Sequence, residues 1–110
     1  MGGILMQQFD VFENPSPTSR KSLPFLIILQ HDRASETDSV VVAGLTPLSK
    51  TSKMAKSRLY PSLNLNGKGY QMITPNMATI RRSLLQKRVA NFELDHRKII
   101  DAVDMLFTGI

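Results

Sequence analysis

The sequence predicts a mainly β domain, either a small antiparallel barrel or a pair of sheets, with one α-helix packed across it. Three observations support this class. The 110 residues are one domain's worth of chain, enough to bury roughly 65% of the surface that the unfolded chain exposes. Short apolar runs separated by Pro, Gly and Asn recur along most of the chain, and helical periodicity is clear only in the last segment. We find no internal repeat and no domain linker.

The predicted strands of the first half alternate with polar loops. Residues 8–13 are the first candidate, and the proline-punctuated residues 14–19 form a loop, because proline fixes φ and donates no ladder hydrogen bond. Residues 25–30 form a run that is apolar up to Leu29, typical of a strand buried on both faces. Residues 40–42 predict a third strand, and Ala43-Gly44 a bulge.

The second half predicts a hairpin between two less certain regions. Residues 46–57, rich in Ser, Thr and Lys, indicate an exposed excursion. Residues 63–65 alternate between apolar and polar side chains, as in a strand. Asn66-Gly67 indicates a hairpin turn, because both residues tolerate positive φ, and residues 70–73 form the returning strand. Residues 77–80 and 84–89 fit either the helical or the strand period. In the first half, the polar residues 31–39 form a loop.

The terminal helix has the clearest pattern. Glu93 and Asp95 lie near its start, where the helix dipole favours negative charge, and Gly109 lies just past its end, where a left-handed cap suits glycine. Its apolar stripe comprises His96, Ile99, Ile100, Val103, Leu106 and Phe107.

Composition excludes several classes of protein. There is no cysteine, which excludes disulfide scaffolds, thiolate zinc sites and cysteine nucleophiles, and suits a cytoplasmic protein. No apolar run approaches the roughly 20 residues that span a bilayer, and the start has no secretory signal. We expect residues 1–5 to be an extension, with Met6 an alternative start, and residues 6–110 to be the domain.

The net charge of +5 favours polyanionic partners, nucleic acid or an acidic protein. The basic residues form two clusters, which are either solvated faces or contact surfaces. These clusters are Lys50, Lys53, Lys56 and Arg58, and Arg81, Arg82, Lys87 and Arg88.

Candidate chemistry is sparse. No phosphate-binding glycine loop is present, and His31 and His96 are not spaced as metal ligands, so neither a cofactor nor a metal is expected. The position of His96 on the apolar stripe predicts a packed core histidine. Asp101 and Asp104 share one helical face and predict a solvated surface.

Several blocks of the chain resemble the CcdB toxins of bacterial toxin–antitoxin modules, and in this order they cover nearly everything after Met6. They are Met6-Gln7-Gln8-Phe9-Asp10-Val11, Leu29-Gln30-His31-Asp32, Leu59-Tyr60-Pro61, Met72-Ile73-Thr74-Pro75-Asn76-Met77-Ala78, Val89-Ala90, His96-Arg97 and Leu106-Phe107-Thr108-Gly109-Ile110.

The resemblance implies an SH3-like antiparallel barrel with a small extra sheet and a C-terminal α-helix, in a two-fold homodimer. It implies a protein that acts by binding rather than as an enzyme: such toxins bind the DNA gyrase A subunit and trap the cleavage complex. A CcdA-like antitoxin neutralises the toxin, and the two together bind operator DNA and repress their own operon.

The resemblance also implies the gyrase contact, which uses the last helical turn and the end of the second strand. By position these residues are Asp104, Thr108, Gly109, Ile110, His31, Asp32 and Arg33. The best-known member of the family has tryptophan where this chain has Thr108, so a cation–π contact of about 0.5–2 kcal/mol is missing. His31, Arg33 and Asp104 also depart from that pattern, and the antitoxin-binding residues are unknown.

Two alternatives stay open. His31, Asp32 and Arg33 place a base, an acid and a cation together, which suits general acid–base cleavage of RNA by an endoribonuclease toxin on the same barrel. The other alternative is a non-toxic chromosomal homologue that retains only antitoxin binding.

Overall fold

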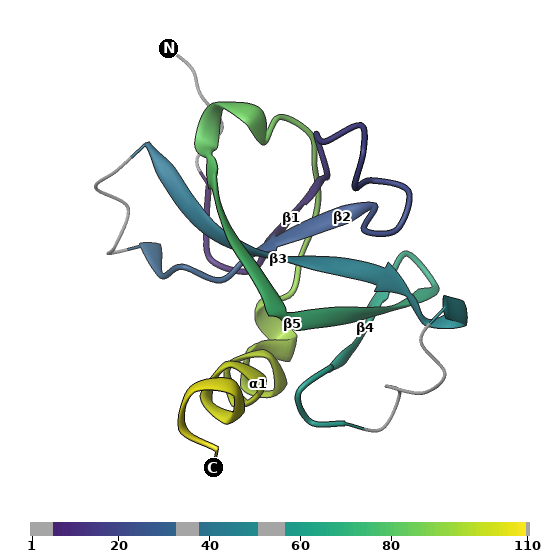
Figure 1. The fold of residues 1–110 in the computed structure, drawn as a ribbon, viewed down its shortest axis with the longest axis vertical. Helices are drawn as coiled ribbons and strands as arrows, with labels where there is room; N and C mark the ends of the chain where they lie inside the picture. Colours follow the sequence, from purple (N-terminus) through teal and green to yellow (C-terminus); the bar gives the residue numbers. More distant parts are fainter. Residues whose placement is uncertain (1–5, 33–37, 51–56, 110) are drawn as a thin grey trace.

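The computed structural model describes residues 6–32, 38–50 and 57–109, and it shows one antiparallel sheet curled into a nearly closed barrel, with one α-helix at its end (Figure 1). The main elements are β1 (Asp10–Glu13), β2 (Phe25–Ile28), β3 (Ser39–Pro47), β4 (Ser62–Leu65), β5 (Lys68–Arg81), β6 (Arg88–Asn91) and α1 (His96–Thr108). The order of the strands in the sheet is β4-β5-β3-β2-β1-β6. Short 3-10 helices in the described residues include η2 (Leu48–Lys50), η3 (Arg82–Leu84) and η4 (Glu93–Asp95).

This arrangement confirms the expected mainly β class with a C-terminal helix. The small extra sheet is not separate, because β4 joins the same six-stranded sheet through β5. Some predictions from the sequence concern residues that lie outside the described ones, namely residues 1–5, Lys53 and Lys56.

The long strands β3 and β5 connect the two ends of the sheet. They pair from Ser39 with Arg81 to Pro47 with Tyr70, and the register shifts between Ala43 and Gly44. The predicted bulge is therefore confirmed. The shift lets both strands bend, so that one part belongs to the barrel and the other joins β4 (Figure 1).

Two expectations about these strands are wrong. Thr46 and Pro47, expected in an exposed excursion, end β3, and Thr46 is buried opposite Gln71. Residues 70–73 and 77–80, expected as separate segments, belong to the single strand β5. In both cases pairing along a long neighbour outweighs the local composition.

Strand β2 separates two hydrophobic clusters, which confirms burial on both faces. Leu26 and Ile28 point into one cluster, together with Phe12 and Val42. The other cluster lies between the sheet, the β4–β5 hairpin and the helix. Its buried members are Phe9, Val11, Ile27, Leu29, Ala43, Leu45, Leu63, Leu65, Tyr70, Met72, Phe92, Ile99 and Ala102.

The β4–β5 turn forms as the sequence predicts. Asn66 and Gly67 have φ of 53° and 84°, the sign that a tight two-residue hairpin requires. The Gly67 N–H donates to Asn64 Oδ1 at 2.8 Å, which closes the turn.

Helix α1 packs through its buried Ile99 and Ala102 and ends where expected. Gly109 has φ of 73°, and its N–H donates to the Met105 carbonyl at 3.0 Å, so the predicted left-handed cap is confirmed. Phe107, however, which fits the apolar stripe, is 69% exposed. No helix in the described part of the chain is long and apolar enough to cross a membrane.

The prediction of a core histidine is wrong. His96 is exposed because it occupies the first position of α1, at the end of the stripe. Its Nδ1 lies 2.9 Å from the Glu93 carbonyl, and its ring centroid lies 6.4 Å from that of Phe9.

Candidate functional site

The site residues implied by the resemblance fall at two places in the fold. His31 and Asp32 follow β2, and both are exposed. Asp104, Thr108 and Gly109 lie at the carboxyl end of α1 and are also exposed. The remaining two, Arg33 and Ile110, lie outside the described residues.

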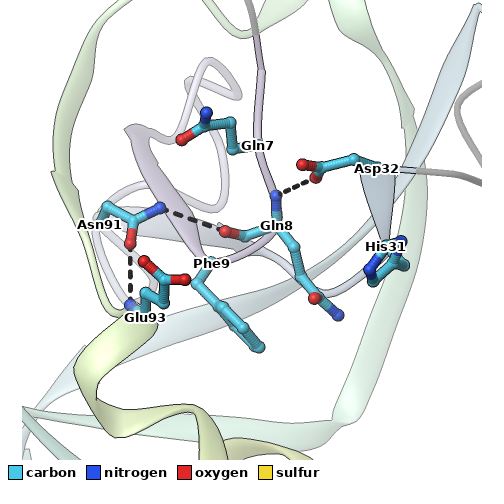
Figure 2. A pocket seen from close by; sticks show the side chains of 7 residues that line it. All are labelled: Gln7, Gln8, Phe9, His31, Asp32, Asn91 and Glu93. Carbon is cyan, nitrogen blue, oxygen red and sulfur yellow. Dashed lines mark hydrogen bonds between the residues drawn. The ribbon is translucent and has the colours of Figure 1, made fainter.

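His31 and Asp32 line an open, polar pocket of about 220 Å³ (Figure 2). The pocket forms where three segments meet: the chain before β1, the residues after β2, and the residues that lead from β6 into α1. Its full lining is Gln7, Gln8, Phe9, His31, Asp32, Asn91 and Glu93.

Hydrogen bonds hold the walls of this pocket together. The Gln8 N–H donates to Asp32 Oδ1 at 2.7 Å, and Gln8 Nε2 donates to the Leu29 carbonyl at 2.9 Å. On the other side, Asn91 Nδ2 donates to the Gln8 carbonyl at 3.1 Å, and Asn91 Oδ1 accepts from the Glu93 N–H at 2.8 Å. Gln8 is therefore fixed from both sides, and the pocket is formed before any ligand binds.

The floor of the pocket contains a strained residue. Phe9 has φ of 72°, a left-handed conformation that bulky residues rarely adopt. Its N–H donates to the Ile28 carbonyl at 2.8 Å, and its own carbonyl accepts from the Phe92 N–H at 3.0 Å. These bonds and the buried ring hold the conformation, whose cost is of order 1–3 kcal/mol.

Beneath the pocket, Asp10 is 1% exposed and accepts three hydrogen bonds. The donors are the Gln7 N–H at 2.9 Å, Asn91 Nδ2 at 2.9 Å and Arg88 Nη1 at 3.2 Å. A buried carboxylate is tolerated only when it is paired and hydrogen-bonded in this way. Asp10 thereby links β6 to the segment before β1.

The carboxyl end of α1 lies at the end of the helix that is far from the pocket. Glu93, which lines the pocket, lies just before α1, and the 13 residues of the helix span about 20 Å. Thr108 Oγ1 donates to the Asp104 carbonyl at 2.7 Å. Within one copy, the structure thus places the pocket near the amino end of α1 and the second group of predicted site residues at its carboxyl end.

An ion pair anchors the middle of α1. Arg58 donates through Nε and Nη2 to the two carboxylate oxygens of Asp101, at 2.9 and 2.7 Å. These hydrogen bonds and the charge hold the pKa of Asp101 below its ordinary value and raise the pKa of Arg58. Asp104 is exposed as expected, whereas Asp101 is half-buried and paired.

The second basic cluster is partly neutralised. Arg88 pairs with Asp10, and Lys87 Nζ lies 3.5 Å from Glu13 Oε2. Arg81 is exposed at the end of β5. Pairing leaves less of this cluster available for a polyanion than its composition indicates.

Nothing in the sequence predicted that Gln7, Gln8, Asn91 and Glu93 line one pocket with His31 and Asp32. Gln7 and Gln8 belong to a block that resembles the CcdB family, but Gln8 and Asn91 are separated by 83 positions. Only the register of β1 with β6, which pairs Asp10 with Asn91, brings these segments together.

A comparison with protein families matches residues 8–109 to the family described as CcdB protein. No curated protein matches the chain. The family match covers β1 to the helix cap and therefore includes the carboxyl end of α1 and all of the pocket lining except Gln7.

Proposed function

The chain belongs to the CcdB family of toxin–antitoxin toxins, and from that premise we propose that it binds the A subunit of DNA gyrase and traps the gyrase–DNA cleavage complex. It acts in the cytoplasm as a homodimer. A CcdA-like antitoxin neutralises it, and the toxin–antitoxin complex binds operator DNA and represses their operon.

The observation that carries this proposal is the shape of the carboxyl end of α1. Phe107 is 69% exposed, and Thr108 and Gly109 are exposed beside it. The same helix is fixed to the body of the protein by buried Ile99 and by the Arg58 ion pair with Asp101. A rigid apolar projection binds a partner's groove without a large ordering cost.

The end of α1 keeps one exposed aromatic ring although it lacks the tryptophan. Thr108 turns its hydroxyl back to the Asp104 carbonyl, so its side chain offers little beyond the helix. Phe107, one residue earlier, supplies an exposed aromatic ring. In a homodimer the two copies present two such ends to a two-fold target.

A binding assay tests the proposal. We expect gyrase A to capture the full chain, and to lose capture when Gly109 and Ile110 are deleted, because the cap of α1 is then removed. Leu84→Ala is the matched control, since Leu84 is 50% exposed and belongs to η3, in another part of the fold. Thermal unfolding checks that each variant folds. A truncated chain that still binds gyrase and still arrests growth contradicts the site assignment.

Incubation with RNA separates this proposal from the endoribonuclease alternative. His31 and Asp32 line the pocket together, but Glu93 adds a second carboxylate there. Two carboxylates repel a phosphate backbone, so we expect the RNA to stay intact. Cleavage that is lost in His31→Ala contradicts this expectation.

A further inference from the structure

We propose that the loop between β1 and β2 (residues 14–24, the β1–β2 loop) contacts the phosphate backbone of duplex DNA through Arg20 and Lys21. The inference goes beyond the proposed function, because it gives the toxin chain itself a direct contact with DNA. It rests on the proposed function only in taking operator DNA as the duplex that is bound in the cell.

The β1–β2 loop is closed by hydrogen bonds before any partner binds. Asn14, which is 5% exposed, donates through Nδ2 to Ser19 Oγ at 2.9 Å and to the Leu23 carbonyl at 2.8 Å. Its Oδ1 accepts from the Ser16 N–H at 3.0 Å, and its own N–H donates to the Pro24 carbonyl at 3.0 Å, which joins the two ends of the loop. A loop with such an internal network loses little conformational entropy on binding.

The loop carries two cations that have no carboxylate partner. Arg20 and Lys21 are exposed, and neither side chain makes an ion pair or a hydrogen bond with the described residues. The sequence holds no Asp or Glu from residue 14 to residue 31. Glu13, which precedes the loop, lies 3.5 Å from Lys87 Nζ through its Oε2. Both charges of the loop are therefore available to an anion.

Uncharged donors beside these two side chains indicate an oxyanion. The N–H of the exposed Lys21 has no hydrogen-bond partner among the described residues. The hydroxyls of Thr18 and Ser22 are also exposed, and that of Ser22 makes only a long bond, at 3.4 Å, to the Ser19 carbonyl. Cationic side chains, hydroxyls and backbone N–H groups are together the donors that bind phosphate oxygens in protein–DNA interfaces.

The polar character of the loop favours DNA over an acidic peptide. The large apolar side chains that are exposed in the described part of the chain are Leu84, Leu94 and Phe107, and none of them belongs to the loop. The pocket beside His31 includes no residue of the loop either. Peptides bind through apolar anchors in grooves or pockets, whereas DNA binding without sequence preference draws its affinity from phosphate contacts.

The loop is also distant from the surface proposed to bind gyrase. Figure 1 shows the β1–β2 loop at the upper right and the carboxyl end of α1 at the bottom. Residues 93–108 hold four acidic and two basic side chains, within a protein of net charge +5. Duplex DNA is therefore attracted to the basic loop and not to the helix.

The salt dependence of DNA binding tests the loop. Fluorescence anisotropy of a short labelled duplex of random sequence is measured with the full chain at several NaCl concentrations. The logarithm of the affinity falls linearly with the logarithm of the salt concentration, with a slope of about −0.9 for each phosphate contact. We expect the double variant Arg20→Gln, Lys21→Gln to bind more weakly, with a slope smaller in magnitude by about 1.8. Its thermal unfolding should match wild type, because both side chains are exposed.

The matched control is Arg97→Gln, Lys98→Gln, which removes the same two charges from the exposed surface of α1 and should leave the slope unchanged. The proposal is overturned if the wild-type chain does not bind the duplex, if the loop variant has the wild-type slope, or if the control loses as much as the loop variant. A poly-glutamate peptide tests the other class of partner. Binding of this peptide that is tighter than that of the duplex and is lost in the loop variant overturns the assignment to DNA.

Capture of gyrase A separates this inference from the proposed function. We expect the loop variant to capture gyrase A as well as wild type does, because the loop and the carboxyl end of α1 are separate surfaces. Loss of capture in the loop variant places the loop in the gyrase contact and overturns the inference. Failure of the wild-type chain to capture gyrase A contradicts the proposed function, and the DNA titration still decides the role of the loop.

Discussion

Replacement of the buried carboxylate of Asp10 tests the network under the pocket. Asp10→Ala removes the acceptor for the Gln7 N–H, for Asn91 Nδ2 and for Arg88 Nη1. A hydrogen bond contributes about 0.5–1.5 kcal/mol, or about 1.5–3 kcal/mol when it involves a charged group. The three donors lie on residues that reach solvent, so water partly replaces the lost bonds. We therefore expect the free energy of unfolding to fall by about 3 kcal/mol.

Urea denaturation measures this loss, with Asp38→Ala as the control. Asp38 is an exposed carboxylate, and its replacement should change the free energy of unfolding by no more than about 0.5 kcal/mol. Asp10→Asn keeps one oxygen acceptor and should be intermediate. The reasoning is refuted if Asp10→Ala unfolds at the same urea concentration as the control.

Three further predictions concern the helix anchor, the hairpin and the bulge. The pKa of Asp101 is lowered in the folded state, so its pairing with Arg58 stabilises the fold above the ordinary Asp pKa of about 3.9, and this stabilisation is lost as the pH falls through the folded pKa. The melting temperatures of Asp101→Asn and wild type should therefore differ at pH 7 and converge near pH 2. An equal difference in melting temperature at both pH values contradicts this. Gly67→Ala should cost about 1 kcal/mol in chemical denaturation, because φ is 84° and no atom lies within 4 Å of the added methyl; no change argues against the turn geometry. Gly44→Ala places a methyl 2.9 Å from the Leu23 side chain and should lower the free energy of unfolding by about 1–3 kcal/mol. Adding Leu23→Ala should reduce this loss. Additive losses in the double variant would show that the two sites do not touch.

The elements that the sequence predicted well are those whose signal is local. Asn66-Gly67 requires only two residues that tolerate positive φ, and Gly109 only one at the end of a periodic stripe. The aliphatic run of β2 indicated burial on both faces because every residue in it is apolar.

The elements that the sequence missed depend on distant partners. Thr46 looks like loop composition and becomes buried only because β5 pairs with it. His96 fits the apolar period, yet it occupies the first position of α1 and is exposed. The same limit applies to the site: Phe107 fits the apolar stripe and yet is exposed, and the pocket depends on the pairing of β1 with β6, which no local sequence pattern predicts.

A cleavage assay tests whether the carboxyl end of α1 is the surface that acts on gyrase. Supercoiled plasmid, purified gyrase and ATP are incubated with the full chain or with a chain that lacks Gly109 and Ile110, and trapped complexes are read as linear DNA after denaturation. We expect linear DNA to accumulate with the full chain and not with the shortened one. Equal linear DNA with both chains, or none with the full chain, contradicts it.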